Sequence, residues 1–234
     1  TGLERLSGTP FRKEIAQYHC ELAMNAMIDQ QPDQVRFHLA NAIDANKKCV
    51  RANVLLGDLE IQSGSHAAAI SHWKHIEFQD PEYLVLIAPK LLQSYTALHK
   101  SKEGIALLKS YLDNYKLPSL MSALYESTLA VEGAGSAATL ARKELIRQPS
   151  LRTLDQLLQA RALVEHSAKS KSHQDIELMQ QTVRNAIGDR AAYHCNQCGF
   201  RAKQYHWQCP ACNAWESLPA EPSEAITREM TIKK

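Results

Sequence analysis

The sequence is poor in the residues that make turns, and it lacks a long hydrophobic run. Its 234 residues contain 9 glycines and 9 prolines, about 8% of the chain, against roughly 12% in average proteins. This scarcity favours long helices over a turn-rich β-sandwich. The longest apolar run, Tyr83 to Ala88, has six residues, whereas a membrane-spanning helix needs about 18 or more. The first fourteen residues are polar and carry no secretory signal pattern.

An excess of charge of one sign is also missing. The chain has 27 lysines and arginines against 25 acidic residues, a formal net charge of +2. Proteins that bind nucleic acid mainly through phosphate contacts carry a larger basic excess. We therefore expect no nucleic-acid partner. Apolar residues make up 44% of the chain, which is too high for a disordered protein and typical of a packed one.

The cysteines form a spaced cluster near the carboxyl terminus. Of six in the chain, four follow the pattern C-x2-C-x10-C-x2-C, namely Cys195, Cys198, Cys209 and Cys212. A secreted disulfide framework spreads its cysteines over the fold. Paired C-x-x-C segments instead suit four thiolates around one tetrahedral metal, at about 2.3 Å for zinc. The pattern predicts a metal site and a reducing compartment.

Residues beside these cysteines fit two turns that close on the metal. Gly199 and Asn213 each follow a C-x-x-C pair, and both residue types tolerate the positive φ that such a turn needs. The ten residues between the pairs predict a short β-hairpin. Four cysteines complete the coordination shell, so the metal should be structural rather than catalytic. We interpret His194 and His206 as flanking histidines that do not bind it.

The same segment resembles the knuckles of rubredoxin through its C-x-x-C-G and C-P-x-C sequences. Its short excursion favours a compact zinc ribbon over an iron redox centre, although tetrahedral thiolate sites suit both metals. A disulfide or redox pair is the third alternative. Five aromatic residues crowd this segment, as a miniature core or as anchors for a partner: Tyr193, Phe200, Tyr205, Trp207 and Trp215.

A period of 34 residues runs through the preceding part of the chain. Residues 55–81 resemble the tetratricopeptide repeat (TPR), a helix–turn–helix unit. Small residues at template positions 8 and 20 let paired helices approach, and large ones at 7 and 24 fill the space between neighbours. Glu60 departs from the pattern, because position 11 is normally aromatic. The matching residues are Leu56, Gly57, Ala69, Trp73, Ile76 and Pro81.

Weaker copies lie on both sides of this unit. Their matching residues are Leu22, Ala23, Leu39 and Ala42 upstream, and Leu91, Leu92, Tyr95, Gly104, Leu108, Leu124, Ala137 and Pro149 downstream. A further helix pair is expected near 151–167 and 171–187. One unit cannot bury its apolar face alone, so the units should stack. An unrelated all-α fold built from helical hairpins is the alternative.

These patterns predict an all-α, TPR-like α-solenoid of helical hairpins with a small C-terminal rubredoxin-like zinc ribbon. The expected divisions are an N-terminal lead-in over 1–14, about five helix pairs over 15–189, the metal module over 190–217 and a flexible tail over 218–234.

The order of TPR units and cysteine module resembles the LapB (lipopolysaccharide assembly protein B) family of Gram-negative bacteria. The segments that carry the likeness are residues 15–23 (IAQYHCELA), 49–58 (CVRANVLLGD), 79–83 (QDPEY) and 193–215. The resemblance covers nearly the whole chain up to about residue 217, and the metal module is its most specific part. It assigns Cys195, Cys198, Cys209 and Cys212 as metal ligands, and it identifies no partner-binding residue by motif.

The resemblance implies a non-enzymatic adaptor. The family restrains lipid A synthesis by presenting the LpxC deacetylase to the membrane protease FtsH. The resemblance places the repeats and the metal module at the cytoplasmic face of the inner membrane. It expects the membrane anchor and further repeats upstream of this chain, which would itself be a soluble fragment.

Other functional classes remain as alternatives. A generic TPR adaptor for chaperone tails or other peptides is the main one, and a zinc-ribbon nucleic-acid binder is a weaker one. For an enzyme we find no phosphate loop and no H-E-x-x-H motif. His72 and His75, three residues apart near Glu77 and Asp80, could mimic a metal-binding helix face, but we interpret them as part of a solvated helix surface. We therefore predict no catalytic residues.

Overall fold

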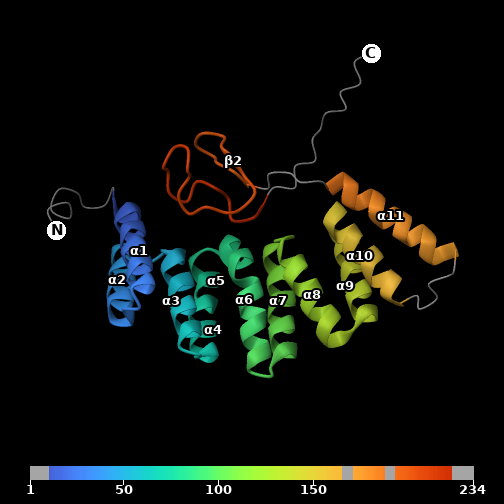
Figure 1. Cartoon of the computed structure of the whole chain (residues 1–234), viewed down its shortest axis with the longest axis horizontal. Helices are drawn as coiled ribbons and strands as arrows, with labels where there is room; N and C mark the ends of the chain where they lie inside the picture. The colour runs from blue at the N-terminus through green and yellow to red at the C-terminus, as the bar shows by residue number, and fades with distance from the viewer. Residues whose placement is uncertain (1–10, 165–170, 188–192, 223–234) are drawn as a thin grey trace, which may run out of the picture. The chain divides into compact units, whose positions relative to one another are not determined.

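The computed structural model describes residues 11–164, 171–187 and 193–222, with the side chains of 171–173 excluded (Figure 1). The chain divides into two compact units, Thr1–Tyr115 and Lys116–Lys234. The predicted boundary between residues 189 and 190 lies outside the described residues. Among the described residues, no helix combines the length and the apolar character that crossing a membrane requires.

The first unit is a series of helices in which each pair packs on the next. Helices α1 and α2, α3 and α4, and α6 and α7 form antiparallel neighbours, and α2 contacts α3 while α4 contacts α6. The elements are α1 (Arg12–Ile28), α2 (Pro32–Ala45), α3 (Val50–Gln62), α4 (His66–Lys74), α5 (Ile76–Gln79), the 3-10 turn η1 (Pro81–Tyr83), α6 (Leu84–Ala97) and α7 (Ser101–Tyr115).

The second unit continues the same construction and then changes to short strands. Its helices contact one another in chain order, α8 with α9, α9 with α10 and α10 with α11. The elements are α8 (Leu120–Glu132), α9 (Ala134–Arg147), α10 (Leu151–Val164), α11 (Lys171–Ile187), β1 (Tyr193–His194) and β2 (Arg201–Ala202). Stacked helical hairpins followed by a small two-stranded sheet confirm the predicted all-α, solenoid-like fold class.

Close approach of paired helices explains the small residues of the repeat pattern. A Cβ atom on Gly57 would lie 2.1 Å from Nε1 of Trp73, which is 1% exposed. That indole nitrogen donates a hydrogen bond to the Val54 carbonyl of α3 at 3.3 Å. In the next pair, a Cβ atom on Gly104 would lie 2.8 Å from the Cβ atom of Tyr95. Glycine is required in both places because the neighbouring aromatic ring occupies the space of a side chain.

Glycines with positive φ and one capping aspartate mark turns between the helices. Gly64 and Gly133, with φ of 73° and 86°, separate α3 from α4 and α8 from α9. The Asp80 side chain accepts a hydrogen bond from the Glu82 amide at 3.1 Å and caps the turn that begins at Pro81. Gly135 lies inside α9, and Gly133 supplies the residue with positive φ at this turn.

Two residues differ from the repeat expectation, each for a local reason. Glu60, which stands where the pattern wants an aromatic residue, is 7% exposed. Its carboxylate accepts a 2.7 Å hydrogen bond from Arg36 of α2, so an ion pair replaces the aromatic contact between neighbouring pairs. Leu22, expected to fill space between units, is 46% exposed, because α1 buries its opposite face, which includes Ala23, against α2 and α3.

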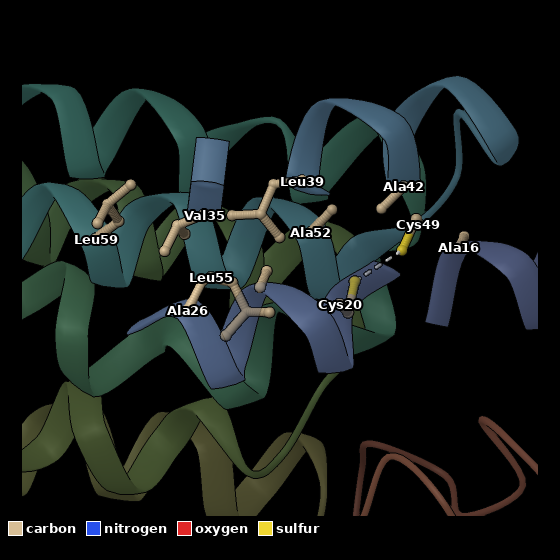
Figure 2. Close-up of a cluster of buried hydrophobic side chains, with 11 residues drawn as sticks. Ala16, Cys20, Ala26, Val35, Leu39, Ala42, Cys49, Ala52, Leu55 and Leu59 are labelled. Atoms are coloured by element: carbon tan, nitrogen blue, oxygen red, sulfur yellow. Dashed lines mark hydrogen bonds between the residues drawn. The ribbon is translucent and has the colours of Figure 1, made fainter. Parts of the chain in front are cut away.

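The core between the first two pairs consists of small and branched apolar residues (Figure 2). Helices α1, α2 and α3 contribute to it, and the side chains face inward from all three. Its members are Ala16, Cys20, Ala23, Ala26, Val35, Leu39, Ala42, Cys49, Ala52, Leu55 and Leu59. Alanine recurs on α1 because a small side chain lets that helix lie close to its partners. The lead-in expected over 1–14 is shorter than predicted, since α1 begins at Arg12. Residues 1–10 lie outside the described residues.

The contact between Gly57 and Trp73 gives a direct test of the helix spacing. Replacing Gly57 by Ala should destabilise the first unit by about 1–3 kcal/mol, because the new methyl group overpacks a filled contact. Urea unfolding followed by Trp fluorescence would measure the change. Gly135→Ala is the control: a Cβ atom there meets nothing within 4 Å and the position is helical, so stability should stay equal or rise slightly. Equal effects of the two substitutions would contradict the proposed contact.

Candidate metal centre

The structure brings the sulfur atoms of all four clustered cysteines together. Their Sγ atoms lie within 4.8 Å of one another. Two of the separations join different knuckles, 3.8 Å from Cys195 to Cys212 and 3.7 Å from Cys198 to Cys209. Ligands of a tetrahedral ion at 2.3 Å stand about 3.8 Å apart. Cys195 and Cys209 are buried, whereas Cys198 and Cys212 are exposed, so the site sits at the edge of the module.

Each C-x-x-C pair forms a knuckle with the same hydrogen bonds. The amide four residues after the first cysteine donates back to that cysteine's carbonyl, and the first cysteine's own amide donates to the carbonyl five residues on. These bonds are Gly199 N to Cys195 O (2.9 Å), Cys195 N to Phe200 O (2.8 Å), Asn213 N to Cys209 O (2.9 Å) and Cys209 N to Ala214 O (2.9 Å). Gly199 and Asn213 have φ of 74° and 59°, which confirms the positive φ predicted for both.

The strands flank the knuckles rather than filling the excursion between them. Strand β1 pairs antiparallel with β2, with Tyr193 opposite Ala202, and so encloses the first knuckle. An isolated antiparallel bridge between Gln208 and Trp215 encloses the second. The hairpin predicted within the excursion is therefore replaced by two short pairings. The reason is that each knuckle brings its own flanking residues together, and strand pairing follows from that closure.

A small apolar core supports the metal cluster. Buried Ala202 and Leu218 pack with Cys195 and Cys209, and Tyr193, Phe200 and Tyr205 pack against them. Edge-to-face contacts link Tyr193 to Tyr205 at 5.9 Å and Tyr205 to Trp207 at 5.1 Å between ring centroids. All five aromatic residues of the module are only half-buried. So few fully buried side chains supply little folding free energy, and a metal is needed to hold so small a segment.

A serine hydroxyl supports one of the buried sulfurs. Ser217 Oγ lies 3.3 Å from Cys195 Sγ, and the Ser217 carbonyl accepts the Asn196 amide at 2.8 Å. The pKa of Cys195 is lowered to about 6, mainly by the hydrogen bond with the Ser217 hydroxyl. Hydrogen bonds from backbone amides of the knuckle lower this pKa as well. A lowered pKa favours the thiolate, which is the form that binds metal.

No histidine or carboxylate of the described residues joins this cluster or forms another group of three or more metal-binding side chains. His194 and His206 lie beside the knuckles and are half-buried. On α4, His72 is half-buried and His75, at its end, is exposed, and burial lowers the pKa of His72. Four thiolates around one position leave no open coordination site, so the arrangement supports a structural metal.

The packed part of the module extends beyond the expected boundary at residue 217. Leu218 and Ala220 are each 1% exposed. The Glu221 carboxylate accepts hydrogen bonds from the Ser119 amide at 3.0 Å and from its hydroxyl at 2.5 Å, at the residue that precedes α8. The tail predicted to start at 218 therefore begins with packed residues, and its remaining part, 223–234, lies outside the described residues.

Sequence analysis missed one cluster of reactive side chains. Cys20 and Cys49 lie 29 positions apart in the sequence, and their Sγ atoms are 3.7 Å apart in the core of the first unit. The residues themselves carry no motif. The available signal was partial: Cys20 lies on the buried face of a repeat helix, whereas Cys49 is the residue before α3.

Comparison with known proteins gives one match to the metal module and others that cover most of the chain. Residues 193–220 match the model of a protein family described as the rubredoxin metal binding domain. The chain is also 24% identical to lipopolysaccharide assembly protein B of Escherichia coli strain K12 over 216 residues, which is 92% of this chain and 55% of that protein. It is 23% identical over 208 residues to the protein of the same name from Haemophilus influenzae, covering 88% of this chain and 51% of the relative.

These similarities confirm the resemblance to lipopolysaccharide assembly protein B seen in the sequence. They extend through the helical hairpins as well as the metal module, so the likeness does not rest on the cysteine pattern alone. The chain spans about half the length of the curated relatives it matches.

Removal of one thiolate should release the metal. In Cys209→Ser, the three remaining thiolates leave one coordination position open on the buried side of the site. Elemental analysis should show loss of most of the bound metal. Near-UV circular dichroism should show loss of signal from the module's tryptophans. His206→Ala is the matched control in the same segment and should keep one metal ion per chain. A full metal content in Cys209→Ser, or loss of metal in His206→Ala, would show that the ligand set is wrong.

Truncation separates the packed end of the module from the residues that follow. A chain ending at Pro222 should retain metal and stability. A chain ending at Ser217 loses Leu218 and Ala220, and removing a buried leucine alone costs about 2–5 kcal/mol. Metal release during urea titration should therefore occur at clearly lower urea in the shorter chain. Identical titration curves for the two chains would disprove a structural role for residues 218–222.

Proposed function

We propose that this chain belongs to a non-enzymatic adaptor of the lipopolysaccharide assembly protein B type, which regulates lipopolysaccharide synthesis by presenting the LpxC deacetylase to the membrane protease FtsH. One observation carries the proposal. The similarity covers 92% of the chain and preserves the order of helical hairpins followed by a four-cysteine module. The proteolytic partners come from the resemblance stated above. The relatives' name refers to lipopolysaccharide assembly.

The geometry suits recruitment of other proteins. Helical pairs that stack in sequence present long helix faces side by side, which is how repeat proteins bind extended segments or helices of a partner. The metal module adds a compact surface that carries half-buried aromatic rings, among them Tyr193, Tyr205 and Trp207. Aromatic side chains of this kind often anchor partners at interfaces. The module is thus suited to act as a second docking surface.

We further propose that Cys195, Cys198, Cys209 and Cys212 hold one structural Zn²⁺. A bound zinc ion would join the two knuckles as a Lewis acid shared by four thiolates, without taking part in a reaction. The residues around the site contribute the rest: knuckle amides orient the sulfurs, Ser217 supports the Cys195 thiolate, and Leu218 covers the buried side. Iron is the alternative metal, and it would give a coloured protein.

The resemblance also suggests where the protein acts. We propose that the two units lie at the cytoplasmic face of the inner membrane. Recruitment of a deacetylase to a membrane protease requires both partners to meet on that face, and reduced thiols for metal binding fit the same compartment.

The structure does not add an observation in favour of a chaperone-tail clamp. Such a clamp needs basic side chains available to a peptide carboxylate. Arg51 of α3 is 3% exposed and donates to Glu21 at 2.7 Å. Lys90 of α6 contacts both carboxylate oxygens of Asp58 at 2.6 and 2.7 Å. Carboxylates of this chain already engage these two cations.

A reconstituted degradation assay tests the proposal. Purified zinc-loaded chain should bind LpxC and FtsH in pull-down experiments, and adding it should change the rate at which FtsH degrades LpxC at least severalfold. Cys209→Ser should lose part of this activity, whereas Gly135→Ala, which leaves packing unchanged, should keep it. Recovery of chaperone carboxyl-terminal peptides with neither LpxC nor FtsH would favour the alternative adaptor and reject the proposal.

A further inference from the structure

Two cysteines outside the metal module face each other in the core of the first unit (Figure 2). Cys20 lies within α1, and Cys49 immediately precedes α3. Both side chains are 0% exposed, and their Sγ atoms are 3.7 Å apart, joined by a thiol–thiol hydrogen bond. Cys20 and Cys49 are the two cysteines among the described residues of this cluster, and Met27 also packs against it. The pair belongs to the first unit, whereas the metal-site cysteines belong to the second.

The arrangement is close to that of a covalent crosslink. A disulfide bond has an S–S length of about 2.05 Å, so the two sulfurs need to approach by about 1.7 Å, which rotations of both side chains can share. Cys49 is the residue before α3, with φ of −70° and ψ of 90°. Its amide donates to the Asn46 carbonyl at 2.9 Å and its carbonyl accepts from Gln79 at 3.4 Å, so the approach of the sulfurs must come from side-chain rotation. Ala16, Ala42 and Ala52 belong to the same cluster and have small side chains. The two sulfur atoms are larger than any atom of these alanines.

We propose that Cys20 and Cys49 are a modification site at which a low-molecular-weight disulfide, such as oxidised glutathione, introduces a reversible crosslink between α1 and the start of α3. This inference is independent of the proposed adaptor function. It assigns to the first unit a redox-dependent state in which the first helical pair is fixed to the second.

The reaction proceeds by two thiol–disulfide exchanges. One cysteine loses its proton to solvent, and its thiolate attacks a sulfur of the small disulfide; a mixed disulfide forms and one small thiolate leaves. The second cysteine then loses its proton, attacks the protein sulfur of the mixed disulfide and releases the other small thiolate. Two protein thiols are oxidised, and one small disulfide is reduced to two thiols.

Burial makes the first exchange slow and the second one efficient. The hydrogen bond to Cys49, together with burial, raises the pKa of the Cys20 thiol, so the nucleophilic thiolate is scarce while the core is closed. The small disulfide can therefore react only during local opening of α1 from α3. When the helices close again, packing brings the second sulfur against the first, which favours release of the bulky adduct over its retention.

The crosslink should restrict opening of the first unit. It joins residues 29 positions apart, and a loop of that length loses much of its conformational freedom when it is closed by a covalent bond. Amide hydrogen exchange in α1 and α3 should consequently slow at least about tenfold in the oxidised form. Exchange in α10 and α11, which belong to the other unit, should stay unchanged.

The test uses the full zinc-loaded chain in buffers of defined oxidised and reduced glutathione. After equilibration, acid quenching, alkylation and digestion, mass spectrometry should recover a peptide pair joined through Cys20 and Cys49, and dithiothreitol should remove it and restore fast exchange. Refolding of the reduced chain in the same buffer should give the same crosslinked state. Agreement between the two routes would show that slow access of glutathione to the folded core does not limit the result. Cys20→Ser and Cys49→Ser should each keep zinc and lose the slowed exchange.

A different outcome of the same experiment would overturn the proposed crosslink. If both routes end in folded, zinc-containing protein whose Cys20 and Cys49 are recovered as separate thiols or glutathione adducts, the crosslink does not form. The measurement on the chain without substitutions decides the question even if a serine variant fails to fold. It does not involve LpxC or FtsH, so its failure is distinguishable from failure of the adaptor proposal.

Discussion

Burial of the apolar face of each helical pair by the next pair is the constraint on which the helical part of this protein depends. A single hairpin leaves too much apolar surface in water, so its stability comes from its neighbours. In the first unit this contact runs through α2 with α3 and α4 with α6. Within a pair, close packing depends on small residues that admit large ones: Gly57 of α3 receives the ring of Trp73 of α4, and Gly104 of α7 receives Tyr95 of α6.

The metal module solves the same shortage of apolar burial in another way. About thirty residues provide only a few fully buried side chains, Leu218 and Ala220 among them, and the convergence of four sulfurs replaces the missing core. The two knuckles repeat one hydrogen-bond pattern, which fixes each sulfur from the backbone rather than from side-chain packing. Such a module can expose aromatic rings to partners without losing its fold.

Polar groups in the helical core follow the same logic of local compensation. The Glu60 carboxylate replaces an aromatic contact of the repeat because Arg36 reaches it from the preceding pair. Arg51 is buried beside Gln17 and Glu21, with hydrogen bonds of 3.2 and 2.7 Å. Buried charges of this kind are tolerated only when paired, so these contacts also fix the register of one pair on the next.

Local spacing encodes the helical hairpins, the repeat register around Gly57 and Trp73, and the four cysteines with the positive-φ residues Gly199 and Asn213. Helix periodicity and knuckle geometry depend on residues a few positions apart, so these features can be predicted from the chain. Three other features follow from the folded chain: Cys20 meets Cys49, Glu221 accepts hydrogen bonds from Ser119 before α8, and Leu218 packs in the metal module. The Cys20–Cys49 and Ser119–Glu221 contacts join residues 29 or more positions apart, and the burial of Leu218 depends on how the metal module folds back on itself. No local sequence pattern specifies contacts of this kind.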